Sequence, residues 1–97
     1  MTENFKESLK AVSTGHYDYN AAVKLYDKEI EENPSNISAY NNRGLCRIHL
    51  GSEPYNSSII KDGIEDFTTA IQLAEKESLP SENIQHNLAW AISLLKF

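Results

Sequence analysis

The sequence predicts an all-α fold in which about five helices stack as antiparallel hairpins. Apolar and aromatic residues recur at steps of three and four, as at Tyr19, Ala22 and Tyr26, which is the spacing of one helix face. Asn33-Pro34 interrupts this pattern, because proline lacks an amide hydrogen and disfavours helix in the residue before it. Gly44 lies inside the next helical pattern, where glycine costs about 1 kcal/mol relative to alanine. We therefore expect a neighbouring helix to approach closely at Gly44.

The first two helices are predicted at residues 2–14 and 19–32. Thr2 is a suitable N-cap for the first helix, and Gly15 is suited to end it. Within the first helix, one face carries an apolar series at helical spacing, which comprises Phe5, Leu9 and Val12.

The third helix is expected to begin at Ile37, after the N-cap residue Asn36, and to end at Gly51. A polar loop over residues 52–58 should follow. The fourth helix then carries a continuous apolar stripe, whose members are Ile60, Gly63, Ile64, Phe67, Ala70, Ile71 and Ala74.

A closing helix is predicted at residues 82–97, capped by Ser81 after the turn at Pro80. Its inner stripe comprises Ile84, Leu88, Ala91, Ile92 and Leu95. A second stripe comprises Trp90, Leu94 and Phe97. The outer side of a terminal helix should be polar, so the second stripe indicates either an external contact, including self-association, or a Trp90 that covers the floor of a groove while Phe97 frays.

The stretch from Tyr19 to Gly51 resembles a tetratricopeptide repeat, a helix-turn-helix unit of roughly 34 residues. The resemblance rests on Tyr19-x-x-Ala22-x-x-x-Tyr26, then Asn33-Pro34, then Ala39-Tyr40-x-Asn42-x-Gly44. It implies a single domain over residues 1–97, with one repeat at about 2–34, a second at about 36–77, and the closing helix as a cap.

Three features depart from the repeat pattern. Glu29 replaces a small residue, and Arg43 and Arg47 replace large apolar ones. Residues 52–58 belong to an insertion of about seven residues, which is either a tolerated surface loop or a segment that contacts a partner. The surface loop is the favoured interpretation.

The resemblance also implies a function, because first helices of successive repeats line a concave surface that binds a partner peptide or protein. Carried over by pattern, the groove residues are Lys6, Lys10, Asn41, Asn42, Leu45, His49, His86, Trp90 and Leu94. Some members hold a partner's terminal carboxylate with a clamp of lysines, asparagines and an arginine. Lys6 and Asn42 match that clamp, whereas Lys10, Asn83 and Asn87 do not.

The acidic composition limits the classes of partner. The 97 residues carry a formal net charge of −5, whereas non-specific nucleic-acid binding needs a basic surface. A protein partner is therefore expected, and a nucleic acid is not. An alternative function is a small immunity or antitoxin-type inhibitor that covers a basic toxin, which a neighbouring toxin gene would support.

The sequence contains no recognisable catalytic or metal-binding pattern. His16, His49 and His86 lack metal-ligand spacing, and Cys46, the only cysteine, is interpreted as a small buried residue. No phosphate loop or nucleophile motif is present. We therefore expect a protein that is not an enzyme and needs no cofactor. No apolar run reaches the roughly 20 residues of a membrane span, and the N-terminus lacks a signal-peptide core, so the expected location is the cytoplasm.

Overall fold

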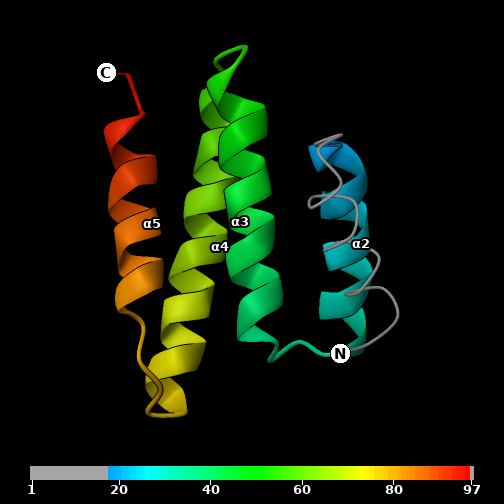
Figure 1. The fold of residues 1–97 in the computed structure, drawn as a ribbon, viewed down its shortest axis with the longest axis vertical. Helices are drawn as coiled ribbons and strands as arrows, with labels where there is room; N and C mark the ends of the chain where they lie inside the picture. Colours follow the sequence, from blue (N-terminus) through cyan, green and yellow to red (C-terminus); the bar gives the residue numbers. More distant parts are fainter. Residues whose placement is uncertain (1–17, 97) are drawn as a thin grey trace.

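The computed structural model of the chain describes residues 18–96, which form four helices and no strand. These are α2 (Tyr19–Glu32), α3 (Ile37–Ser52), α4 (Ser57–Lys76) and α5 (Glu82–Ser93). α3 and α4 form a central antiparallel hairpin, with α2 on one flank and α5 on the other (Figure 1). The predicted all-α hairpin fold is confirmed, whereas the helix expected at residues 2–14 lies outside the described residues.

Asparagine and aspartate side chains begin three of the helices. Asp18, Asn36 and Asn56 each accept a hydrogen bond from the backbone N–H three residues later, which satisfies one of the free donors of the first turn. Ser81 holds the corresponding position before α5 but makes no such bond. Its hydroxyl oxygen instead accepts a hydrogen bond from Gln85 Nε2 at 2.8 Å.

α3 and α4 pack most closely where Gly44 faces Gly63. A Cβ atom on Gly44 would lie 2.7 Å from the Phe67 ring, and one on Gly63 would lie 2.7 Å from Ile48 Cδ1. Both distances are far below ordinary van der Waals contact, so neither position has room for a side chain. This contact accounts for the mid-helix glycine at position 44 and confirms the expected close approach.

The polar segment after α3 is shorter than predicted. Ser52 belongs to α3, and α4 already begins at Ser57, so only residues 53–56 connect the two helices. Gly51, expected to end α3, is helical and buried, and a Cβ atom there would lie 2.9 Å from the Ile60 backbone nitrogen. The extra residues therefore lengthen the hairpin, because Gly51 lets the start of α4 pack directly against the last turn of α3.

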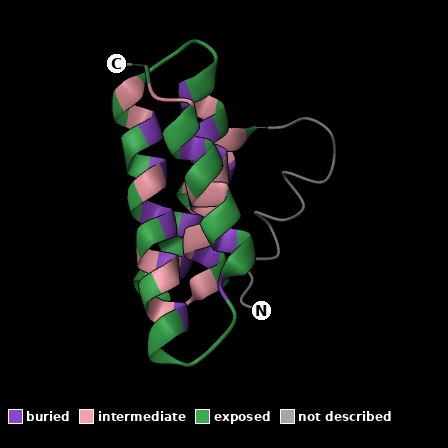
Figure 2. Ribbon diagram, turned by 90° about the vertical axis from the view of Figure 1, so that its left-hand side faces the viewer, coloured by how far each residue is buried: buried purple, intermediate pink, exposed green. Residues whose placement is uncertain are grey.

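The core has two parts, one on each side of the hairpin. Ala22, Tyr26, Ala39 and Cys46 are buried between α2 and α3. The larger cluster joins α3, α4 and α5, and its buried members are Ile48, Ile60, Phe67, Ala70, Ile84 and Ala91. Buried positions line the inner sides of the helices, while exposed positions cover the outer sides (Figure 2).

The closing helix differs from the prediction in its end and in one face. α5 ends at Ser93, because the Leu94 and Leu95 N–H groups bond to carbonyls only three residues back. Ile92, predicted in the inner stripe, is 47% exposed. Leu94, predicted in the outer stripe, is half-buried against the larger core cluster. The outer stripe is therefore partly internal, and Phe97 lies outside the described residues.

A buried carboxylate explains the two arginines that depart from the repeat pattern. The Asp66 side chain on α4 is 4% exposed and accepts two hydrogen bonds from Arg43 and one from Arg47, at 2.7–3.0 Å. Arg43 Nη1 also donates to Asp27 Oδ1 on α2 at 2.8 Å. The arginine head groups thus connect α2, α3 and α4 through ionic hydrogen bonds where the repeat pattern has apolar contacts.

Candidate partner-binding site

Three aromatic rings from three different helices meet at the end of the molecule where α2 begins. The Tyr19 and His49 rings are stacked, with centroids 4.7 Å apart and an interplanar angle of 5°. The His49 and Trp90 rings form a T-shaped pair, with centroids 5.9 Å apart and an interplanar angle of 60°. We call Tyr19, His49 and Trp90 the ring cluster. It joins α2, α3 and α5 through side chains, and Trp90 remains 40% exposed.

A pair of amides makes a second link between α3 and α5. Asn87 Nδ2 donates a hydrogen bond to Asn41 Oδ1 at 3.0 Å. Leu45, one turn after Asn41, and Leu94, one turn after Trp90, are half-buried and pack against the core cluster. The ring cluster, these two asparagines and these two leucines together define what we call the α3–α5 face.

The predicted groove residues divide into three groups. Lys6 and Lys10 lie outside the described residues. Five others, Asn41, Leu45, His49, Trp90 and Leu94, are on the α3–α5 face. Asn42 is half-buried and His86 is exposed, but neither takes part in the ring contacts or the amide hydrogen bond. The assignment of these residues to a partner site stays a prediction.

Sequence reasoning missed the part that Tyr19 plays. Its position in the repeat pattern indicated a residue that packs between helices, and nothing in that pattern pointed to a partner on α3. Tyr19 begins α2, and His49 lies near the end of α3, which runs antiparallel to α2. The antiparallel arrangement brings these two helix ends together, so a sequence separation of 30 residues becomes a ring contact.

Both arginines of α3 are bound to carboxylates. Burial by itself lowers the pKa of Arg43, but hydrogen bonds and charge attraction from Asp66 and Asp27 outweigh burial and raise it above its usual value. Arg47 is bound to the same Asp66 carboxylate. Both arginines are therefore bound to acidic groups of their own chain.

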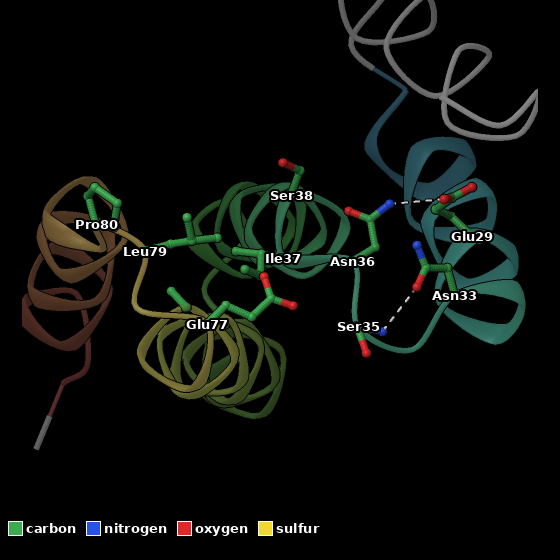
Figure 3. A pocket seen from close by; sticks show the side chains of 10 residues that line it. Glu29, Asn33, Ser35, Asn36, Ile37, Ser38, Glu77, Leu79 and Pro80 are labelled. Carbon is green, nitrogen blue, oxygen red and sulfur yellow. Dashed lines mark hydrogen bonds between the residues drawn. The ribbon is translucent and has the colours of Figure 1, made fainter.

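A shallow depression lies at the other end of α2 and α3, between the α2–α3 turn and the α4–α5 connection (Figure 3). It is lined by Glu29, Asn33, Ser35, Asn36, Ile37, Ser38, Ala74, Glu77, Leu79 and Pro80. Asn36 Nδ2 donates to Glu29 Oε1 at 2.9 Å across its wall. None of the seven described groove residues lines it. Since no buried side-chain nitrogen or oxygen among the described residues lacks a partner, nothing there marks a ligand.

The described residues show no grouping suited to a metal, since no three histidine, cysteine, aspartate or glutamate side chains gather there. Cys46 is buried, and burial raises the pKa of its thiol to about 11. It therefore behaves as a small apolar residue at neutral pH. None of α2 to α5 combines the length and the apolar character needed to cross a bilayer.

Comparison with known proteins finds partial relatives. Serine/threonine-protein phosphatase 5 of Homo sapiens and of Rattus norvegicus are each 37% identical to this chain over 73 residues. The match covers 72% of this chain but only 13% of the phosphatase. Hsp70-Hsp90 organizing protein 3 of Arabidopsis thaliana is 36% identical over 55 residues, which are 57% of this chain and 9% of that protein.

No family model matches the chain, and no solved structure matches it significantly. Both kinds of relative contain tetratricopeptide repeats, so the matches support a tetratricopeptide-like relationship. Because this chain spans so small a part of each relative, the activity named for the whole phosphatase belongs to that protein.

Proposed function

We propose that this chain is a non-enzymatic protein-interaction module of the tetratricopeptide type, which binds a partner peptide or protein on the α3–α5 face. The observation that carries the proposal is the ring cluster, in which Trp90 meets His49 in a T-shaped arrangement while 40% of it stays exposed. A large aromatic side chain that is fixed in place yet exposed is typical of the anchors that dominate interface energies. The kinship with two repeat-containing proteins supports the same class of function.

Capture of partners from the native host tests this function. Immobilised wild-type protein should retain a partner that Trp90→Ala loses, because the indole is the largest ring of the cluster and is 40% exposed. Ile92→Ala is the matched control, since Ile92 is also on α5 and is 47% exposed but lies outside the ring cluster. If the partner binds both variants as well as wild type, the α3–α5 face is not the binding surface.

A chaperone tail is one candidate peptide, since the plant relative is named for organizing Hsp70 and Hsp90. A carboxylate clamp would need cationic residues on α5 at the positions where this chain has Asn83 and Asn87. Asn87 is moreover hydrogen-bonded to Asn41. These features weigh against a clamp of the usual kind on α5.

The immunity or antitoxin-type inhibitor is the second candidate function, and the net charge of −5 favours it. The Asp27 and Asp66 carboxylates are paired with arginines, so attraction to a basic toxin would come from the remaining acidic residues. If a toxin gene lies next to the gene for this chain, cells that express the toxin should grow again when this chain is co-expressed. The cytoplasmic location and self-association through the C-terminal helix stay predictions.

A further inference from the structure

We infer that the α3–α5 face selects its partner through an uncharged anchor side chain, aromatic or long and aliphatic, and not through a terminal carboxylate or a basic side chain. The inference rests on the proposed function, because it names the chemistry of the partner segment that binds there. It depends on three features of the described residues of this face: they include no free lysine or arginine, α3 and α5 carry no carboxylate near the ring cluster, and the Trp90 ring is exposed.

Free cations are missing from the described part of this face. The only cationic residues of α3 are Arg43 and Arg47, and both are bound to Asp66. α5 itself has no lysine or arginine, and the Lys96 that follows it places its Nζ 4.7 Å from the centre of the Tyr55 ring. A partner carboxylate would lose its water here without gaining a cation, which is unfavourable.

Carboxylates are equally scarce on the two helices. α3 contains no aspartate or glutamate, and the only one in α5 is Glu82 in its first turn. Glu82 precedes Trp90 by eight residues, about two helical turns. A lysine or arginine anchor would therefore find aromatic faces but no carboxylate near Trp90 on α3 or α5, while Asp18 beside Tyr19 already accepts the Ala21 N–H as the cap of α2. The face is neutral although the chain carries nine basic and fourteen acidic residues.

The apolar part of the face is preformed. His49 is held between Tyr19 and Trp90, so the Trp90 ring has an aromatic neighbour on one side. Leu45 and Leu94 lie one turn away on the same two helices and are half-buried. An incoming apolar side chain would cover the exposed part of the indole and remove apolar area from water, which is favourable at about 25 cal/mol per Å².

A phage-displayed random-peptide library tests the inference, provided that each peptide is joined to the coat protein by its C-terminus and so offers no free carboxylate. Selection on wild-type protein should enrich peptides that share one Phe, Trp, Leu or Met. The consensus, synthesised as a C-terminal amide, should bind with a Kd that changes less than about threefold between about 50 and about 500 mM salt. Trp90 is the only tryptophan of the chain, so its fluorescence reports binding directly.

Changes in the peptide and in the protein should agree. Replacing the shared anchor by alanine should weaken binding at least about tenfold, and this measurement does not depend on the stability of any protein variant. Trp90→Ala, measured by calorimetry and accompanied by a thermal melt, should give a similar loss. Ile92→Ala should bind as wild type, and Lys6→Ala/Lys10→Ala should lose less affinity than Trp90→Ala.

The inference is overturned if enriched peptides share acidic or basic residues, if the free acid binds far more tightly than the amide, or if no peptide is enriched. The inference is also overturned if Lys6→Ala/Lys10→Ala loses more affinity for the peptide than Trp90→Ala does. The proposed function is judged separately. If host partners depend on Trp90 but the selected peptides are charged, the module function stands and only the anchor chemistry is wrong.

Discussion

α3 packs against α4 and against α5 in opposite ways. Toward α4, Gly44 and Gly63 bring the backbones so close that no Cβ atom fits. Toward α5, long side chains make the contact instead, through the Asn41–Asn87 hydrogen bond and the ring cluster. The first side is buried and closed, whereas the second leaves Trp90 40% exposed.

This difference indicates where the molecule can bind a partner without losing its fold. The α3–α4 contact has no room for change, since each backbone fills the space that a neighbouring side chain would need. The α3–α5 face has rings and amides whose outer edges still contact solvent. Stability and binding should therefore respond to different substitutions on the same helix.

Gly44→Leu should break the closed side of α3 and have the largest effect. The added side chain would overlap the Phe67 ring, so we expect a loss of about 3 kcal/mol in the free energy of unfolding, measured by urea denaturation. Ala89 is its control, because it is a small residue inside α5 that is exposed. Ala89→Leu should change stability by less than about 0.5 kcal/mol. Equal effects of the two substitutions would refute the contrast between the two sides.

Asp66→Asn tests how much the ionic hydrogen bonds between α3 and α4 contribute to stability. Removing this carboxylate leaves Arg43 and Arg47 without their shared acceptor, and we expect a loss of about 2 kcal/mol. The effect should stay below that of a fully buried pair, because the arginine side chains are 16% and 24% exposed. Asp62→Asn, at an exposed position on the same helix, is the control. A thermal melt unchanged by Asp66→Asn would show that solvent replaces the network.

Cys46 offers a pH test of the contact between α2 and α3. Its pKa is raised by burial to about 11 in the fold, so the thiol is protonated there while the unfolded chain ionises at about 8.5. Its contribution is therefore complete below pH about 8.5 and falls as the pH rises through 11, by about 3 kcal/mol at most. Denaturation of wild type and Cys46→Ala across this window should show the additional loss only in wild type.

Tyr55→Phe should have the smallest effect. It tests the contact between the α3–α4 connection and the segment that follows α5. The Tyr55 hydroxyl accepts a hydrogen bond from the Lys96 backbone N–H at 2.8 Å. Its removal should cost about 0.5 kcal/mol and raise amide hydrogen exchange after the end of α5. A loss above about 2 kcal/mol would mean that the tip of the α3–α4 hairpin is part of the core.

The helices and their beginnings were predictable because local chemistry determines them. The break at Asn33-Pro34, the cap at Asn36 and the apolar stripe of α4 all follow from residues within a few positions of each other. The close approach at Gly44 was also predictable, since an isolated helix has no reason to keep a glycine there. Five of the seven described groove residues lie on the α3–α5 face, and their assignment to a partner site stays a prediction.

Other features were invisible in the sequence because their causes lie in contacts between distant segments. A polar run after Gly51 suggested a loop, but Gly51 packs on Ile60 and lets both helices continue. Arg43 and Arg47 depart from the repeat pattern in the sequence, and only the fold shows that both bind the Asp66 carboxylate.

The sequence by itself determined the helical class and the turns, since propensity, capping and periodicity are local, and for the partner site it supplied a prediction. Only the tertiary structure decided which side chains meet. Tyr19, His49 and Trp90 come from α2, α3 and α5, and no sequence spacing relates them. Their cluster exists because antiparallel packing brings the start of α2 beside the end of α3, while α5 on the other flank brings Trp90 next to His49, a geometry set by the two core clusters.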